Sequence, residues 1–255
     1  MNFIAEPYRQ VFRQIGFSAE MIFTDPAIKP WRRLQDRENC TWEIPAAAGA
    51  IRLHVKRFPS MGSSSPARDE AEGYRLLHDR GILAAIVAAW GDLDDGRSFI
   101  ATEDLSGFTP ADKLVESGLS FDRLLIPTAD LSARLHNAGL HHRDLYLCHF
   151  LARCENDQPA DLRLIDAARV RPLPGLLTRR RWIVKDLAQF WYSTTQLAIT
   201  DSQREQWLQH YCGQTEAGKI EPLKRSIQRK SDAIGAHDEK LRRREPRRNI
   251  SIPRI

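Results

Sequence analysis

The chain has 255 residues, of which 42% are hydrophobic and 28% are charged, values typical of a folded soluble protein. Its longest apolar run, Ile82–Trp90, is too short to cross a bilayer and is expected to be buried core. The N-terminal MNFIAEPYRQ lacks the basic and then apolar pattern of a signal peptide, and the four scattered cysteines favour free thiols in a reducing cytosol over zinc or disulfides.

The positive charge of the chain is concentrated at its C-terminal end. Residues 219–255 hold twelve Lys or Arg against five Asp or Glu, whereas the chain as a whole is only +5. Such a basic tail can contact the phosphates of nucleic acid, an anionic membrane surface or a phosphorylated glycolipid, and it is equally compatible with a solvated helix and a frayed terminus. No aromatic residue interrupts it and no recognition motif accompanies it, so nucleic acid is not expected as a partner.

The front of the chain is rich in strand patterns. The first thirty residues show no clear period, but β-branched and aromatic residues alternate or cluster from Trp31 to Lys56, which predicts an antiparallel meander. A loop rich in Ser, Gly and Pro, residues 59–68, leads into a helix over 67–80 that ends at Gly81. Two more strands are predicted over 86–93 and 97–105.

After Leu105 the pattern becomes mainly helical. Apolar spacing predicts a helix over 121–139 with Gly139 as its terminator, and two later helices over 181–198 and 201–213. Between the first two lie the segment HHRDLYLCHFLA (141–152), a polar hairpin and the strand LRLID (162–166). We therefore expect an α+β fold with two lobes and a cleft between them, a β-rich N-lobe over 1–104 and a helical C-lobe over 105–255.

The segment 141–152 places charged and polar groups in a strip that is otherwise apolar, and such groups are costly to bury unless they are paired or used. Asp144 follows a sharp connection and Asp166 ends a strand, so we expect both at exposed tips of neighbouring short strands. Two carboxylates and a distant lysine suit phosphoryl transfer from a metal–nucleotide. One acid orients or deprotonates a hydroxyl, the other holds the metal, and the lysine neutralises the phosphates.

These residues resemble a known family. His142-Arg143-Asp144, His149 and Leu164-Ile165-Asp166 look like the catalytic loop and the metal-binding strand of the protein-kinase-like fold. More narrowly, HRDLYLCHFLA, LIDAARV and RWIVKDLAQFWYST resemble the Kdo/WaaP-type lipopolysaccharide kinases, particularly the heptose kinases of the inner core, which carry His where most kinases place a metal-binding Asn. The resemblance covers residues 31–212 and is best over 131–197.

The resemblance implies ATP and Mg²⁺ as cofactors and a role for each matching residue. Asp144 would accept the proton of the acceptor hydroxyl or orient it, and His149 and Asp166 would hold Mg²⁺ against the nucleotide phosphates. Lys56 would contact the α and β phosphates. Glu72 would pair with Lys56; Glu70 is the competing partner, and its offset of two residues means that at most one of them fits.

Further positions follow from the same resemblance. Backbone groups from Glu103 to Leu105 would read adenine. His142 and Arg143 are expected to brace the catalytic loop, and Lys185 and Asp186 to anchor it from beneath. Two departures stand out: QDRENCT replaces the glycine-rich phosphate loop, and the metal strand reads Asp-Ala-Ala instead of Asp-Phe-Gly.

The predicted function is therefore phosphorylation of a sugar hydroxyl, with heptose as the expected sugar, on the lipopolysaccharide core glycolipid. The enzyme would act at the cytoplasmic face of the inner membrane, with peripheral contact between the basic tail and anionic lipid. Alternatives are a kinase of the same fold acting on Kdo, another glycan or a protein, and a catalytically silent binding module. Zinc or iron binding by the histidine cluster would leave Lys56, Glu72 and Asp166 unexplained. The sequence does not indicate an oligomeric state.

Overall fold

The computed structural model describes residues 2–46, 49–60, 64–213, 217–244 and 250–251. The chain divides into two compact units. The first holds the residues up to Tyr74 together with Ala85–Ser106 and the short strand Ile250–Ser251. The second holds Arg75–Ala84 and Gly107–Arg244.

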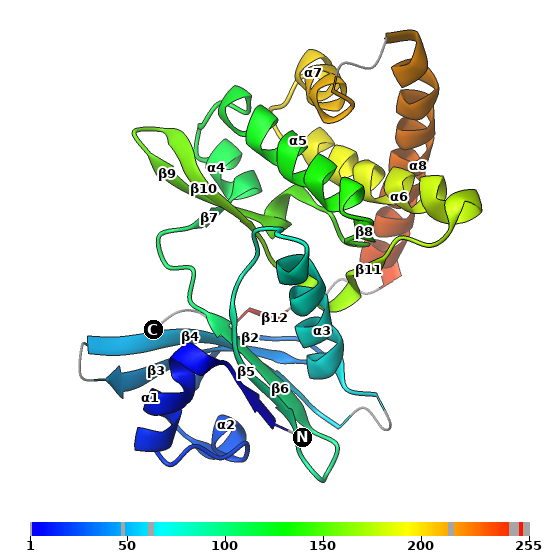
Figure 1. Ribbon diagram of the computed structural model, residues 1–255. Helices are drawn as coiled ribbons and strands as arrows, with labels where there is room; N and C mark the ends of the chain where they lie inside the picture. Colours follow the sequence, from blue (N-terminus) through cyan, green and yellow to red (C-terminus); the bar gives the residue numbers. More distant parts are fainter. Residues whose placement is uncertain (1, 47–48, 61–63, 214–216, 245–249, 252–255) are drawn as a thin grey trace. The chain divides into compact units, whose positions relative to one another are not determined.

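The first unit is built on a seven-stranded sheet in which every neighbouring pair is antiparallel (Figure 1). In spatial order its strands are β1 (Asn2–Ile4), β5 (Val87–Asp92), β6 (Ser98–Glu103), β4 (Gly49–Phe58), β3 (Glu38–Ala46), β2 (Lys29–Arg33) and β12 (Ile250–Ser251). Its remaining elements are η1 (Glu6–Tyr8), α1 (Arg9–Gln14), α2 (Met21–Thr24) and the start of α3 (Pro66–Asp79).

The two faces of this sheet are covered by different helices. Leu53 and Val55 of β4 are fully buried in a core that includes Phe12 of α1 and Ile22 of α2. Successive side chains of a strand point to opposite faces, so Lys56 belongs to the other face, where it meets α3. The alternation within β4 therefore places the predicted phosphate-binding lysine away from the apolar core.

The second unit is mainly helical. Its larger helices are the remainder of α3, α5 (Asp122–Asn137), α6 (Leu176–Thr195), α7 (Asp201–Tyr211) and α8 (Ala217–Arg244). The shorter elements are β7 (Thr109–Pro110), α4 (Ala111–Glu116), β8 (Leu140–His141), η2 (Leu147–His149), β9 (Phe150–Glu155), β10 (Gln158–Leu164), η3 (Ala167–Arg169) and β11 (Arg171–Pro172). The strands form two small sheets, β10-β9-β7 and β11-β8.

The helices of this unit share an aromatic core. The rings of Trp207 and Phe190 are stacked 4.0 Å apart, and the indole nitrogen of Trp207 donates to Thr128 Oγ1 at 3.0 Å. Stacked aromatic rings bury a large apolar area, and the buried indole N–H has a partner. These contacts pack α5, α6 and α7 together, and α6 in turn bonds the segment 141–152.

Most predicted elements are confirmed, including the α+β class, the meander, and helices that end before a glycine of positive φ, at Gly81 (φ 66°) and Gly139 (φ 76°). Three local expectations need correction. The first thirty residues contain short helices and a strand, α6 begins five residues earlier than position 181, and α8 extends the helical pattern to Arg244.

Parts of the 59–68 loop and of the basic tail, residues 61–63, 245–249 and 252–255, lie outside the described residues. Among the residues that the structure describes, no helix is long and apolar enough to cross a membrane.

Candidate active site

A buried carboxylate holds the segment that carries Asp144. Asp186, on α6, is fully buried, and its two carboxylate oxygens accept the backbone N–H groups of His142 at 2.6 Å and Arg143 at 2.8 Å. His136 Nε2 lies 3.3 Å from the same carboxylate. Burial alone would raise the pKa of Asp186, but the hydrogen bond with His136, its charge and these backbone donors hold it below the usual value. The prediction that Asp186 anchors this loop is confirmed, whereas Lys185 forms no hydrogen bond or ion pair with the loop among the described residues and lies over the ring of Trp182.

Arg143 adopts a left-handed backbone conformation, with φ 70°, directly before Asp144. A residue with a side chain pays a steric cost in this region, and such strain persists only where surrounding contacts hold it. Here the contacts are the bonds to Asp186 and the hydrogen bond from Gln189 Nε2 to the Arg143 carbonyl at 2.8 Å. The turn redirects the chain so that the Asp144 side chain stays partly exposed, at 22%.

Two side chains orient the Asp144 carboxylate. Arg169, in the short helix η3, places Nη1 3.1 Å from Oδ1 and 3.3 Å from Oδ2, and Gln189 donates to Oδ1 at 3.3 Å. Neither Arg169 nor Gln189 was predicted from the sequence. On α6, however, the polar residues Asp186, Gln189 and Ser193 recur at spacings of three and four, which places them on one helix face. All three bond the loop, since Ser193 accepts the Leu147 N–H at 2.9 Å.

His149 and Asp166 face each other. His149 Nδ1 lies 2.6 Å from the Asp144 carbonyl oxygen, so this nitrogen carries the proton, and Nε2 is directed to Asp166 Oδ2 at 3.7 Å. Burial would lower the pKa of His149, but Cys148, the Asp166 carboxylate and the Asp144 carbonyl together raise it to about 9. Asp166 itself has φ 62° and follows β10, whose end is tied to the loop by a hydrogen bond from the Ile165 N–H to the His149 carbonyl at 3.1 Å.

Asp144 and Asp166 each follow a short strand, as expected, but these two strands do not pair with each other. Asp144 follows β8, which pairs with β11, whereas Asp166 follows β10, which pairs with β9. The loop and the strand end are joined instead by His142, whose Nε2 lies 3.2 Å from the Ile165 carbonyl oxygen. This contact confirms that His142 braces the loop.

The Nε2 proton of His149 must leave before this nitrogen can ligate a metal, and metal binding releases such protons. With Nε2 deprotonated, His149 and Asp166 supply one nitrogen and one carboxylate ligand for a divalent cation. Two adjacent ligands of an octahedral Mg²⁺ lie about 3.0 Å apart, so the two atoms, 3.7 Å apart, would need to approach by less than about 1 Å to hold one ion. The bond from Nδ1 to a carbonyl fixes the ring orientation of a ligating imidazole. Two protein ligands suffice for Mg²⁺, which keeps several waters and binds substrate phosphates. Within the described residues, no group of three or more His, Cys, Asp or Glu side chains is placed to hold a metal, so His149 and Asp166 would be the only two protein ligands of this kind at the site.

In the first unit, the predicted lysine is paired, but with the competing glutamate. Lys56 Nζ lies 2.6 Å from Glu70 Oε1, and both side chains are largely buried. Glu72 is exposed, so the expected pair of Lys56 with Glu72 is corrected. The apolar face of α3 explains why Glu70 and not Glu72 pairs with Lys56. This face is formed by residues spaced by four, three and three, namely Ala67, Ala71, Tyr74 and Leu77, and Glu70 lies on the same face. The sequence already contains this spacing.

The segment expected to read adenine offers fewer groups than predicted. The Glu103 backbone N–H donates to the Ile86 carbonyl at 2.8 Å and its side chain accepts the Ile86 N–H at 2.9 Å, so this N–H is engaged inside the sheet. Leu105, after β6, has no backbone hydrogen bond to the described residues. The connection between β2 and β3, residues 34–37, contains no glycine.

An antiparallel sheet with a buried lysine–glutamate pair, followed by a helical unit that presents an aspartate loop and a second aspartate after a hairpin, defines the protein-kinase-like class. A family model described as the lipopolysaccharide kinase (Kdo/WaaP) family matches residues 57–211. The chain belongs to this family, and it is therefore a kinase, an enzyme that transfers a phosphoryl group to a hydroxyl.

Two curated relatives are similar over about 70% of the chain and a third over less than half of it. The lipopolysaccharide core heptose(I) kinase WaaP of Pseudomonas aeruginosa is 27% identical over 210 residues, covering 72% of this chain and 76% of the relative. The protein of the same name from Escherichia coli is 29% identical over 209 residues, 69% and 74% of the two chains. The one from Escherichia coli K12 is 32% identical over 123 residues, 43% and 44%.

Proposed function

We propose that this protein is an ATP-dependent kinase that phosphorylates a hydroxyl of heptose in the lipopolysaccharide inner core. The observation that carries the proposal is the anchored loop of Asp144, in which a partly exposed carboxylate is oriented by Arg169 and Gln189. The names of the similar proteins from Pseudomonas aeruginosa and Escherichia coli supply the acceptor sugar.

Each residue has a distinct role in this proposal. Asp144 accepts or orients the proton of the acceptor hydroxyl, and the hydroxyl oxygen forms a bond to the γ-phosphorus as the bond to the β-phosphate oxygen breaks. Lys56, held by Glu70, contacts the α and β phosphates. His149 and Asp166 hold Mg²⁺, which neutralises charge on the phosphates when bound. Positioning and charge compensation account for the rate, because little covalent chemistry is asked of the protein.

Leu105 is the better candidate for recognition of adenine. Its backbone groups are not engaged by the described residues, whereas the N–H of Glu103 is. In this proposal Glu103 fixes the position of the segment after β6 through its hydrogen bonds with Ile86. The backbone of Leu105 forms the hydrogen bonds with adenine.

The test is phosphate transfer from ATP, in the presence of Mg²⁺, to core oligosaccharides that either contain or lack heptose. Transfer that requires heptose is the expected result. Transfer to Kdo-containing glycans without heptose would move the proposal to another acceptor within the same fold. ATP binding without transfer to any glycan would contradict it and favour a silent binding module.

The basic helix α8 fits an enzyme whose substrate is embedded in an anionic membrane. Arg225, Arg229, Arg243 and Arg244 are exposed on it, and each basic residue near an anionic surface contributes about 1 kcal/mol of attraction. We propose peripheral contact at the inner membrane through this helix. Co-sedimentation with anionic vesicles at low salt should fall when residues 236–255 are removed, and unchanged association would contradict the contact.

A further inference from the structure

Helices α6 and α8 line a pocket that has no part in the function proposed above. Its volume is about 590 Å³, within the range of small-molecule sites. Four of its seven lining residues are cationic, one is aromatic and none is acidic. The lining residues are Leu177, Arg180, Arg181, Trp182, Val184, Lys185 and Lys230.

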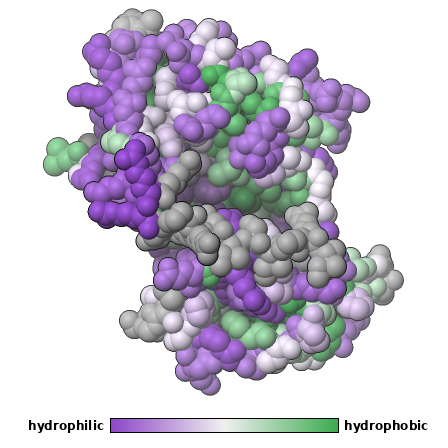
Figure 2. All heavy atoms as spheres, turned by 180° about the vertical axis from the view of Figure 1, so that it is seen from behind, coloured by the Kyte–Doolittle hydropathy of each residue, from purple (hydrophilic) through white to green (hydrophobic). Residues whose placement is uncertain are grey.

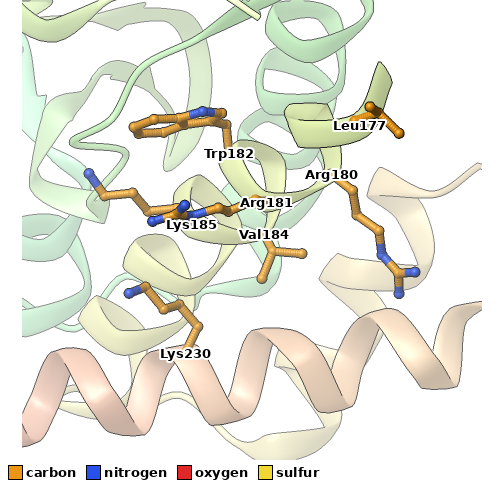
Figure 3. Close-up of a pocket in the computed structure, with 7 residues that line it drawn as sticks. All are labelled: Leu177, Arg180, Arg181, Trp182, Val184, Lys185 and Lys230. Atoms are coloured by element: carbon orange, nitrogen blue, oxygen red, sulfur yellow. The ribbon is translucent and has the colours of Figure 1, made fainter. Parts of the chain in front are cut away.

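The positive charge of this pocket is not compensated within the described part of the chain. None of its four cations forms an ion pair there, whereas Lys224, on the same helix α8, is paired with Glu205 at 2.6 Å. In Figure 3 the charged ends of Arg181, Lys185 and Lys230 gather on one side of α6, and Arg180 points away from them. Strongly hydrophilic residues also cover the surface over α6 and α8 in Figure 2. A concave site with several free cations favours an anionic ligand.

The pocket adjoins the loop that carries Asp144. The Trp182 ring, which lines the pocket, lies 4.9 Å from Arg143 Cζ and 4.8 Å from the ring of His141. Lys185 lies over the same indole at 5.5 Å. Burial and the charges of Arg169 and Arg143 lower the pKa of Lys185, while the charge of Asp144 raises it, so the pocket and the carboxylate share one electrostatic environment.

We propose that this pocket binds an acidic group, a carboxylate or a phosphate, on a sugar next to the one that carries the acceptor hydroxyl. Arginine and lysine donate charge-assisted hydrogen bonds to either group, and the indole of Trp182 supplies an apolar face for a sugar ring. The inference rests on the proposed function, since it makes the pocket part of acceptor recognition. A flat membrane surface is disfavoured because the site is concave, and other exposed cations of α8, such as Arg225 and Lys240, do not line it.

The first test measures binding without ATP. Calorimetry would compare a core oligosaccharide with its carboxylates and phosphates intact, the same glycan after dephosphorylation and carboxyl reduction, inorganic phosphate, and anionic phospholipid vesicles. The Lys230→Gln variant is compared with Lys240→Gln, which removes the same charge from α8 outside the pocket. Loss of a charge-assisted hydrogen bond should weaken binding of the intact glycan about tenfold in Lys230→Gln, with Lys240→Gln close to wild type.

Three results would overturn the proposal: equal binding of the charged and neutralised glycans, equal effects of the two variants, or binding of phosphate or vesicles as tight as that of the intact glycan.

The second test is kinetic, and it should show a rise in KM for the intact acceptor in Lys230→Gln that is larger than any change in kcat. If the glycan bound in a charge-dependent way but no phosphate were transferred, the pocket would still be an acidic-glycan site, and the kinase proposal would be contradicted. Transfer to heptose that ignores the acceptor's charge would contradict the pocket alone.

Discussion

The Lys56 ammonium and the Glu70 carboxylate form an ion pair of 2.6 Å between β4 and α3, and the side chains are only 12% and 2% exposed. Two ions removed from water are stable together, but either one alone is a buried unpaired charge. The pair therefore fixes the lysine in one position, ready to contact an anionic group.

Replacing Glu70 by Gln should lower kcat/KM for ATP by about 10- to 100-fold, since a hydrogen bond to a charged group contributes about 1.5–3 kcal/mol. The matched control is Glu72→Gln, on the same helix but exposed, for which we expect a change smaller than about threefold. Steady-state kinetics with varied ATP would distinguish the two. A larger loss in Glu72→Gln than in Glu70→Gln would contradict the assignment.

Asp186→Asn should lower the free energy of unfolding at pH 7 by about 1–3 kcal/mol, because the buried carboxylate bonds two loop N–H groups and His136. The pKa of Asp186 lies below its usual value of 3.8, so its contribution is present above that pH and is lost as the pH falls through the lower folded value. Urea unfolding of both proteins should show a difference that shrinks below pH 3.8. A constant difference between pH 7 and pH 3 would argue against this linkage.

The metal site predicts a difference between two substitutions of His149. Asparagine supplies a ligand oxygen and alanine supplies none, so at limiting Mg²⁺ His149→Asn should retain more transfer activity than His149→Ala. In His149→Ala the Mg²⁺ concentration for half-maximal rate should rise about 10- to 100-fold.

The control for this metal titration is His237→Asn, an exposed histidine on α8, which should titrate as the wild type. If His149→Ala and the wild type had the same Mg²⁺ dependence, His149 would not be a ligand. In that case its bond to the Asp144 carbonyl would be its whole role.

Much of the fold was predictable because strong local signals agree with the structure. The helix α5 has apolar residues at regular spacing and ends before a glycine of positive φ, and the strands β5 and β6 are short, largely buried segments on either side of a turn. Residues 2–28 were not predictable, because their elements are three to six residues long and are stabilised by packing on the sheet, as the burial of Phe12 and Ile22 shows.

The resemblance identified Asp144 and Asp166 as the carboxylates of the site. The side chains that orient Asp144, however, are distant from it in the sequence. Arg169 lies 25 residues from Asp144 and Gln189 lies 45 residues away, and no periodicity within the loop encodes such contacts. The choice between Glu70 and Glu72 was different. Glu70 lies on the apolar face of α3, which packs toward β4, and Glu72 does not. The spacing of the apolar residues in α3 would therefore have predicted Glu70 as the partner of Lys56 from the sequence.

The central claim is that Asp144 serves transfer of the γ-phosphoryl group to a heptose hydroxyl, and Asp144→Asn tests it most directly. The measurement is the initial rate of phosphate incorporation from labelled ATP into a heptose-containing core oligosaccharide. Asp130→Asn, an exposed aspartate of α5 paired with His210, is the control. We predict a loss of about 10²- to 10⁴-fold in Asp144→Asn, with unchanged thermal unfolding and near wild-type rates in Asp130→Asn. A folded Asp144→Asn protein that phosphorylates heptose at the wild-type rate would contradict the account.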